Sequence, residues 1–223
     1  MQLEEDLERL NQYQKEAVLD DSNACIVNAN VGSGKTTVLI SKIMYLHHVK
    51  KVPYQNMVVL TFTNKAANEI KERLSGSAVG LDMEELGTFG TFHSVALYLL
   101  RNRLPIENLG YTRGFLVIEQ EEELDIAMQV IEEEKLVIKY KNRLKKRLEQ
   151  AVAGQLTENN SRIQDDIFKL VRLLREEKVK QNKMSFSDLL ENTNQLLETD
   201  GMDVKWMIID EVQDCDKMQL DFM

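Results

Sequence analysis

The stretch Ala29-Asn30-Val31-Gly32-Ser33-Gly34-Lys35-Thr36 constrains this chain more than any other feature. It lies between an apolar run at residues 24–27 and a helical pattern that extends from Thr36 to about His48. In such a loop the backbone N–H groups curl around phosphates, aided by the positive end of the following helix. Its glycines allow close approach, Lys35 neutralises phosphate charge, and Thr36 offers a hydroxyl to Mg²⁺. The sequence therefore predicts a nucleotide site, although the loop opens with Ala29 where the consensus has glycine.

A second signal is the pair Asp210-Glu211 at the end of the apolar run 206–209. A carboxylate at the C-terminal end of a parallel strand points into the crevice where nucleotides bind. Asp210 is then placed to hold Mg²⁺, and Glu211 to act as general base toward the attacking water. Alone, two acids after a strand usually mean only that the strand surfaces, so this signal depends on the phosphate loop.

Apolar runs alternate with helical patterns in the first half of the chain. Strands are predicted at residues 24–27, 57–61, 86–91 and 206–209, and helices at residues 36–48, 65–74 and 94–103. Short strands that alternate with helices are typical of βαβ units. We therefore expect an α/β fold with a parallel sheet that is covered on both faces.

The character of the sequence changes after about Phe115. Residues 119–180 are charged, nearly free of glycine and proline, and helical in period. One apolar stripe is Leu136, Tyr140, Leu144, Leu148 and Val152, and a second is Ile163, Ile167, Leu170 and Leu174. We expect an all-helical insertion at residues 115–183 within a discontinuous domain made of residues 1–114 and 184–223. A further helix is predicted at residues 186–197.

A cluster of cations lies in the predicted insertion, at Lys139, Lys141, Arg143, Lys145, Lys146 and Arg147. Clustered cations can contact DNA phosphates. Interleaved with apolar residues at helical spacing, they more often form the solvated side of an amphipathic helix. Both interpretations stay open.

The composition is that of a soluble globular protein, with 43% hydrophobic and 29% charged residues. No apolar run approaches the roughly 18 residues that a membrane span needs, so no membrane partner is expected. The N-terminus is acidic, and Cys25 and Cys215 are interpreted as reduced core residues of a cytoplasmic protein. The net charge of −9 argues against nucleic-acid binding only weakly, because binding needs no more than a local basic surface.

Further stretches occur in a fixed order along the chain: Leu10-Asn11-Gln12-Tyr13-Gln14, Thr61-Phe62-Thr63-Asn64-Lys65-Ala66-Ala67, Gly90-Thr91-Phe92-His93-Ser94 and Asp210-Glu211-Val212-Gln213-Asp214. Together with the phosphate loop they resemble, in order and approximate spacing, the motifs of the UvrD/Rep/PcrA family of superfamily-one DNA helicases. The resemblance covers nearly the whole chain. It implies a RecA-like P-loop NTPase sheet with an inserted subdomain, and ATP and Mg²⁺ as cofactors.

The resemblance also implies roles at the nucleotide. Gln14 would read the adenine edge, because its amide can both donate and accept. Lys35 and Thr36 would hold phosphate and Mg²⁺, Asp210 and Glu211 the metal and the water, and Gln213 would sense the γ-phosphate. The nucleotide-contacting segment would extend from Ala29 to Thr37, where Thr37 stands in place of an arginine found in several relatives.

Contacts with single-stranded or partly duplex DNA are implied as well. Phe62 would lie under a base, and such a stacking platform is worth about 1–3 kcal/mol per base. The DNA backbone would be contacted by Thr63, Asn64, Thr91 and His93. The alternative is that Phe62 and Phe92 are core aromatics and that His93 caps a helix; only the order of the motifs favours DNA contact.

The given sequence ends at Met223, just after the acidic motif. A helicase of this family has a second RecA-like domain, whose arginines can contribute about 10³–10⁵ in rate. We expect that domain to come from a C-terminal region or from another chain, and the residues given to bind nucleotide with little hydrolysis or unwinding alone. Two other hypotheses stay open: the motor of a helicase–nuclease, and a stand-alone half-motor that acts as a regulatory module.

Overall fold

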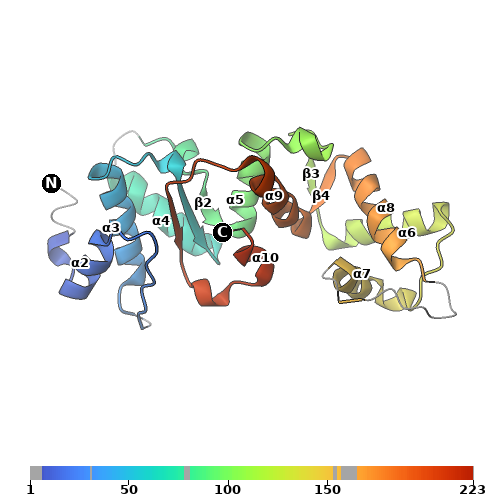
Figure 1. The fold of residues 1–223 in the computed structure, drawn as a ribbon, viewed down its shortest axis with the longest axis horizontal. Coiled ribbons are helices and arrows are strands. Elements are labelled where there is room, and N and C mark those ends of the chain that lie inside the picture. Colours follow the sequence, from blue (N-terminus) through green and yellow to red (C-terminus); the bar gives the residue numbers. More distant parts are fainter. Residues whose placement is uncertain (1–6, 31, 78–80, 153–154, 157–164, 223) are drawn as a thin grey trace. The chain divides into compact units, whose positions relative to one another are not determined.

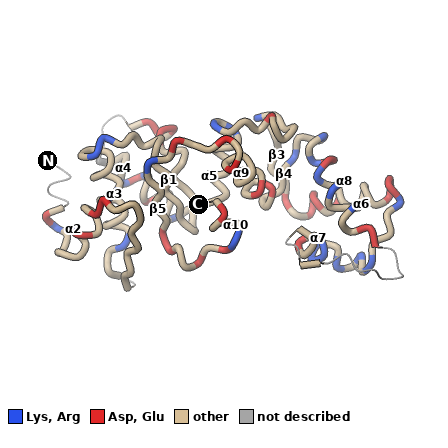
Figure 2. Tube along the Cα trace, in the orientation of Figure 1, with Lys and Arg blue, Asp and Glu red and all other residues tan. Residues whose placement is uncertain are grey.

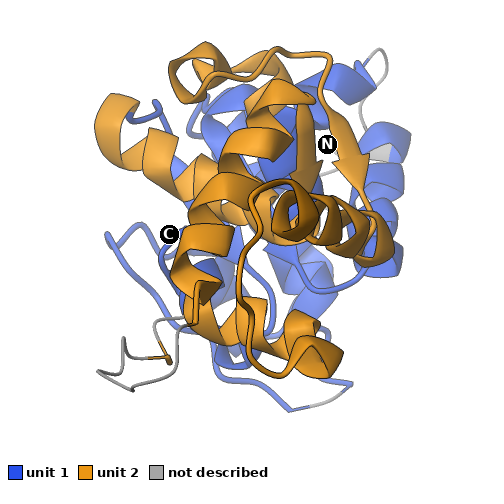
Figure 3. Cartoon of the chain, turned by 90° about the vertical axis from the view of Figure 1, so that its right-hand side faces the viewer, with its two compact units in different colours: residues 1–99, 201–223 blue, residues 100–200 orange. Residues whose placement is uncertain are grey.

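The computed structural model describes residues 7–30, 32–77, 81–152, 155–156 and 165–222. The chain divides into two compact units, residues 1–99 with 201–223 and residues 100–200 (Figure 3). The second unit thus contains the expected insertion, residues 115–183, and extends beyond it on both sides. No helix among the described residues is both long enough and apolar enough to span a bilayer.

The first unit is built on a three-stranded parallel sheet of order β2-β1-β5 (Figure 1). Its strands are β1 (Met57–Thr61), β2 (Phe89–Thr91) and β5 (Trp206–Ile209). The strands predicted at residues 57–61 and 206–209 are confirmed. β2 is shorter than predicted, because Met83–Leu86 forms the 3₁₀ helix η2. All five residues of β1 are buried, as expected for the central strand of a parallel sheet.

β1 and β5 are neighbours in the sheet although about 145 residues separate them in sequence. Their register pairs Met57 with Trp206 and Leu60 with Ile209. The chain therefore leaves the first unit after β2 and returns to the same sheet at β5. This return places the acidic pair beside the end of β1.

The strand predicted at residues 24–27 is wrong. Residues 23–30 have no regular secondary structure, and Ile26 and Val27 are 87% and 51% exposed. An apolar run becomes a strand only where a neighbouring strand pairs with its backbone. In the described sheet β5 pairs only with β1, so no strand pairs with residues 24–27. The segment still leads directly into the phosphate loop.

Five helices belong wholly or mainly to the first unit: α2 (Gln12–Leu19), α3 (Lys35–His48), α4 (Asn64–Ser77), α5 (Phe92–Asn102) and α10 (Lys217–Leu220). The 3₁₀ helices η1 (Tyr54–Asn56) and η5 (Val212–Asp214) complete it. α2 packs on α3, and α4 packs on β1 and β2. The buried core joins Val18 of α2, Ile43 and Leu46 of α3, and Val59 of β1.

The second unit is not all helical. β3 (Leu116–Ile118) and β4 (Lys183–Ser185) form a two-stranded parallel sheet. Asn182 fixes the start of this pair, since its carbonyl accepts from the Leu116 N–H at 2.9 Å and its side chain bonds Thr112. The periodic charged sequence around β3 concealed this short strand.

The helices of the second unit are η3 (Ile106–Leu109), α6 (Gln120–Glu133), η4 (Lys141–Arg143), α7 (Leu144–Val152), α8 (Ile167–Lys180) and α9 (Phe186–Asp200). The apolar faces of α6, α7 and α8 share a core that includes Ile126, Val130, Leu148 and Leu170. Both acidic and basic residues occur along α6 and α8 (Figure 2).

The first apolar stripe of the insertion is only partly helical. α7 begins at Leu144, and Tyr140 before it has a left-handed φ of 50° and is 71% exposed. Leu136 is buried without being helical, while Val152 is exposed. Lys141, Asn142 and Arg143 form a 3₁₀ turn, so the α-helix begins only at Leu144, where the spacing predicted a continuous helix from residue 136. In the second stripe, Ile163 lies outside the described residues.

The two cysteines are free thiols, but they are not core residues. Cys25 is exposed because it belongs to the unpaired segment before the phosphate loop, and Cys215 is half-buried. Their interpretation as core residues is wrong, because it depended on a buried strand at residues 24–27.

Candidate functional site

The phosphate loop connects the extended segment to α3. Val31 lies outside the described residues, while Ala29, Asn30, Gly32, Ser33 and Gly34 are placed. Gly32 and Gly34 have φ angles of 78° and 85°, in the left-handed region that favours glycine. The loop closes with a bond from the Ser33 N–H to the Asn30 carbonyl at 3.2 Å.

α3 begins at Lys35, so Lys35, Thr36 and Thr37 form its first turn. The first intrahelical bond runs from the Val38 N–H to the Gly34 carbonyl at 3.0 Å. The N–H groups of the first turn have no carbonyl a turn earlier to bond, and they carry the positive end of the helix dipole. This helix start, preceded by two left-handed glycines, is the geometry that binds phosphate.

Gln14 lies against the phosphate loop. Its Nε2 donates to the Ser33 carbonyl at 2.9 Å, and its Oε1 accepts from the Asn11 N–H at 2.9 Å. These bonds use one N–H and one acceptor position of an amide that has two of each. A Cβ at Gly34 would lie 3.0 Å from Gln14 Nε2, so glycine permits this close approach. Gln14 is thereby oriented and still able to bond a base edge.

Lys35 is ion-paired with Glu211 across 176 positions of sequence, with Nζ and Oε1 2.5 Å apart. The other carboxylate oxygen of Glu211 accepts from Gln213 Nε2 at 2.7 Å. Lys35 and Gln213 lower the pKa of Glu211, and Glu211 raises the pKa of Lys35. Both groups therefore stay charged near neutral pH, and the structure brings the loop and the acidic motif together as the sequence predicted.

Asp210 and Glu211 differ in their surroundings. Burial raises the pKa of Asp210, the charge of Glu211 raises it further, and Lys35 opposes both. The Asp210 N–H bonds the Leu60 carbonyl at 2.9 Å, which fixes its backbone to β1. Glu211 has a left-handed φ of 54°, a conformation that costs a non-glycine residue about 1–2 kcal/mol. Such strain is characteristic of functional positions.

Among the described residues, no group of three or more histidine, cysteine or acidic side chains is placed to hold a metal ion. Mg²⁺, however, is usually bound through one or two protein ligands together with substrate phosphates and water. Thr36 at the start of α3 and Asp210 at the end of β5 supply a hydroxyl and a carboxylate of this kind. The residues present therefore fit a magnesium–nucleotide site.

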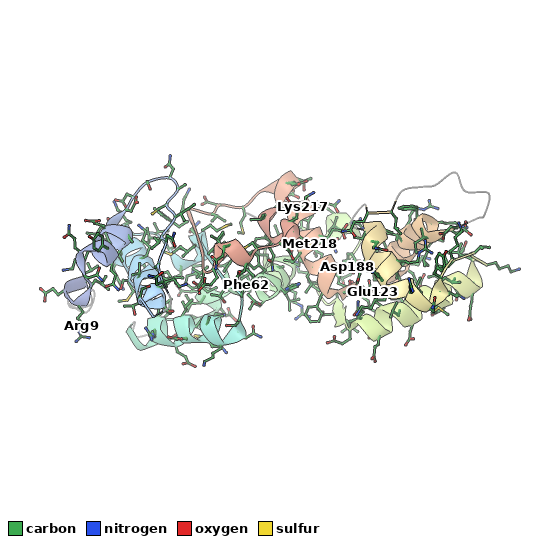
Figure 4. The ribbon with its side chains drawn as sticks, turned by 90° about the horizontal axis from the view of Figure 1, so that it is seen from below. Arg9, Phe62, Glu123, Asp188, Lys217 and Met218 are labelled. Carbon is green, nitrogen blue, oxygen red and sulfur yellow. The ribbon has the colours of Figure 1, made fainter. Side chains whose placement is uncertain are left out.

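The aromatic candidates for DNA contact differ in exposure. Phe92 is buried, at 2% exposure, and packs against Phe222. Phe62, labelled in Figure 4, is 36% exposed, and its ring centroid lies 5.8 Å from that of Phe92. Phe92 is thus a core residue that supports Phe62, while Phe62 presents part of its ring to solvent.

Two of the polar candidates begin helices. Thr63 Oγ1 accepts from the Ala66 N–H at 3.2 Å at the start of α4, and Thr91 Oγ1 accepts from the Ser94 N–H at 3.3 Å at the start of α5. Such bonds are typical of N-caps. Asn64 is the exposed first residue of α4.

His93 lies in the first turn of α5, and burial lowers its pKa, so it is neutral at pH 7. These candidates follow β1 and β2, and the acidic pair follows β5. Because the three strands are parallel and in register, all these residues lie at the same edge of the sheet.

Lys42, in the middle of α3, was not predicted from the sequence. It is 9% exposed, and its Nζ donates to the Val18 carbonyl at 3.0 Å and to the Asp20 carbonyl. A signal was present, because this lysine interrupts the run Ile40–Leu46, every residue of which is buried. A buried lysine generally has specific partners.

Comparison with known proteins agrees with this geometry. Residues 10–223 match the UvrD/REP helicase N-terminal domain family. The chain is 36% identical over 130 residues to the ATP-dependent DNA helicase PcrA of Bacillus subtilis, covering 58% of this chain and 17% of that protein. It is 35% identical over 133 residues to a probable DNA helicase II homolog of Rickettsia conorii, covering 59% of this chain and 19% of that protein.

A longer match is to the ATP-dependent DNA helicase Rep of Buchnera aphidicola, with 26% identity over 226 residues. It covers 94% of this chain and 32% of that protein, so the chain spans at most about a third of the relatives it matches. The family match covers the phosphate loop, the strand ends and the acidic pair alike. This chain belongs to the UvrD/REP helicase N-terminal domain family.

Proposed function

We propose that this chain binds ATP with Mg²⁺ and forms the nucleotide-binding part of an ATP-dependent DNA helicase or translocase that acts on single-stranded DNA. The observation that carries the proposal is the meeting of three distant segments at one site. Gln14 contacts Ser33, and Lys35 contacts Glu211. The relatives named ATP-dependent DNA helicases support the same assignment.

In this proposal Gln14 recognises the adenine edge with the donor and acceptor that its present bonds leave over. The loop from Ala29 to Thr37 cradles the phosphates through its backbone, and Lys35 neutralises their charge. Thr36 and Asp210 would hold a magnesium ion, which would supply charge neutralisation at the phosphates.

Glu211 is the proposed general base. Its lowered pKa keeps it ionised, which a base that accepts a proton from water requires. In the described state its carboxylate is paired with Lys35 and Gln213. When Lys35 turns to a phosphate, Glu211 loses that partner and gains the freedom to orient water, while Gln213 senses the change from the other carboxylate oxygen.

For DNA, the exposed face of Phe62 is the proposed stacking platform for a base. Thr63, Asn64, Thr91 and His93 are the proposed contacts to the DNA backbone. They lie at the same sheet edge as the acidic pair, so a change at the nucleotide needs to travel only across neighbouring strand ends.

A second RecA-like domain is the proposed partner that supplies arginines to the phosphates, either from the same protein or from another chain. For these 223 residues by themselves we expect nucleotide binding with slow hydrolysis. A cleft that closes between two domains is what gives such motors their stroke.

The test is the melting temperature of the 223-residue chain with and without a non-hydrolysable ATP analogue and Mg²⁺. Ligand at about 100 times its dissociation constant should add roughly 2.7 kcal/mol to the stability of the folded state. An unchanged melting temperature at saturating analogue contradicts the nucleotide site. Strong stimulation of the ATPase activity of this chain by single-stranded DNA would contradict the expected dependence on a second domain.

DNA contact is tested separately with Phe62→Ala and a labelled oligonucleotide. Loss of the stacking platform should weaken binding by about 1–3 kcal/mol, equally for different sequences. Phe186→Ala is the matched control, since Phe186 is a phenylalanine of 48% exposure in the other unit, outside the cationic cluster at residues 139–147. Equal loss in both variants argues against a specific role for Phe62.

A further inference from the structure

Lys42 bonds the C-terminal end of α2 from the middle of α3. Its ammonium donates to the Val18 carbonyl at 3.0 Å and to the carbonyl of Asp20, the residue that ends α2. The last carbonyls of a helix have no intrahelical donor, and they carry the negative end of its dipole. A cation there therefore fixes where this helix ends.

The same ammonium also faces β5. It lies 4.6 Å from the ring centroid of Trp206, the first residue of β5, and 5.2 Å from that of Tyr45. Distances of this kind are those of cation–π contacts. One side chain thus touches α2, which carries Gln14, and β5, which carries Asp210 and Glu211, while belonging to α3, which carries Lys35.

A lysine is a costly residue at such a place. Burial disfavours its charged form and lowers its pKa, against the opposing charges of Asp21 and Asp20. An apolar side chain would fill the space without that cost, but it could not bond two carbonyls. The bonds to α2 are therefore what the lysine contributes.

The position of α2 depends on few anchors. The helix has eight residues, too few to be stable from its own propensity. Its N-terminal end is held by the capping box of Asn11 and Gln14 and by the bond from Gln14 to Ser33. Its C-terminal end is held by the buried side chain of Val18 and by Lys42. If the C-terminal anchor is lost, α2 can tilt, and the side chain of Gln14 then shifts relative to Ser33 of the phosphate loop.

We propose that Lys42 is a positioning residue for nucleobase selection: it holds α2 so that Gln14 distinguishes adenine from other bases. The inference rests on the proposed ATP site. It adds to that site a residue which touches neither base nor phosphate and which acts through Gln14.

The experiment measures dissociation constants of ATP, GTP and inorganic tripolyphosphate with Mg²⁺ for the 223-residue chain and its variants. Lys42→Met should reduce the preference for ATP over GTP about tenfold, as expected for losing charged hydrogen bonds that set a geometry. Affinity for tripolyphosphate should stay unchanged, because the loop and Lys35 remain. Lys42→Arg, which keeps a cation and its donors, should retain the preference.

Gln14→Ala separates positioning from general stability. In the Gln14→Ala background, Lys42→Met should cause no further loss of preference, because both changes act through one amide. An additional tenfold loss in the double variant overturns the inference, and so does an unchanged ATP preference in Lys42→Met. An equal loss of affinity for all three ligands also overturns it, because it indicates a general structural role.

Trp206, the single tryptophan of the chain, reports the local geometry independently. Its emission should change in Lys42→Met and remain close to that of the wild type in Lys42→Arg. If Lys42→Met does not fold, Lys42→Gln replaces it. Glutamine is uncharged but keeps an N–H donor, so the carbonyls of Val18 and Asp20 are not both left without a partner. A wild-type chain that binds no ATP overturns the proposed function itself. Normal ATP preference in Lys42→Met, or in Lys42→Gln where Lys42→Met does not fold, overturns only the role of Lys42.

Discussion

Two lysines, one in each unit, form ion pairs with carboxylates distant in sequence, and their surroundings differ sharply. In the first unit Lys35 and Glu211 have side-chain exposures of 30% and 38%. In the second, Lys178 bonds Glu123 and Asp188, with exposures of 6%, 20% and 14%. Figure 4 labels Glu123 and Asp188, which lie next to each other.

The difference in exposure indicates which ion pair can give up its partner to water or a ligand. Burial would lower the pKa of Lys178, but Asp188 and Glu123 raise it overall, so the lysine stays charged. Asp188 also accepts from the Ser185 N–H at 2.7 Å, which fixes the turn from β4 into α9. Removing one member of this cluster leaves buried charges without a partner. In the exposed pair, by contrast, either side chain can bind water or a ligand when its partner is lost. The buried cluster therefore stabilises the fold, and the exposed pair is suited to ligand exchange.

The largest effect is expected from Lys178→Met. Glu123 and Asp188 would be left without their cation, at a cost of about 3–5 kcal/mol in the free energy of unfolding. Urea denaturation followed by helical circular dichroism measures it. Lys180→Met, two residues along α8, removes a pair whose lysine is 70% exposed, and it should leave the free energy of unfolding essentially unchanged. Similar losses in both variants would erase the distinction between buried and exposed pairs.

Lys35→Ala should change ligand binding rather than folding. Losing the phosphate-facing cation should weaken Mg–ATP binding about 100-fold, with little change in melting temperature. Lys50→Ala is the matched control, since it breaks the exposed pair with Asp21 just beyond the other end of α3. A titration with fluorescent nucleotide gives both values. A drop in stability comparable to that of Lys178→Met would show that the exposed pair is structural.

Glu211→Gln tests whether the exposed pair competes with nucleotide. The change frees Lys35 and removes a negative charge near the phosphates, so ATP should bind about three- to tenfold more tightly while hydrolysis falls. Glu72→Gln, an exposed carboxylate on α4, is the control. Weaker binding in Glu211→Gln would mean that Glu211 helps to hold the ligand.

The smallest effect concerns acid sensitivity. Lys35 lowers the pKa of Glu211 below its ordinary value of 4.5, so this group contributes stability above that pH and loses it as the pH falls through the folded-state pKa. The raised pKa of Asp210 has the opposite sign, since its protonation favours the folded state. Between about pH 5 and about pH 3, the melting temperature of Glu211→Gln should therefore fall less than that of the wild type. A steeper fall in the variant would contradict the sign of the Glu211 contribution.

Much of the fold was predictable from local sequence. β1 and β5 are both apolar runs, and the structure reproduces both as strands. β1 is buried throughout, as expected for the central strand of a parallel sheet, while β5, at an edge of the described sheet, is half-buried. That Lys35 and Glu211 lie at one site was expected from motif order and the rule that ligands bind at carboxyl strand ends, whereas their direct ion pair was not predicted.

The errors arose where local pattern and tertiary pairing diverge. Residues 24–27 are apolar enough for a strand, but no described neighbour pairs with them. Tyr140 fits a helical stripe, yet its backbone is left-handed and the helix of that stripe begins only after it, at Leu144. β3 was not predicted, because a strand of three residues is too short to show an alternating sequence pattern. The contacts of Lys42 could not be predicted from the sequence, because they are made with the backbone carbonyls of another helix and not with side chains.

The left-handed backbone of Glu211 has a consequence for engineering. A search for stabilising substitutions would select this residue early, because glycine at φ 54° relieves strain that glutamate must bear. Glu211→Gly would relieve this backbone strain, but it would also remove the ion pair with Lys35 and the proposed general base. Relief of backbone strain and the proposed catalytic role therefore place opposite demands on this residue.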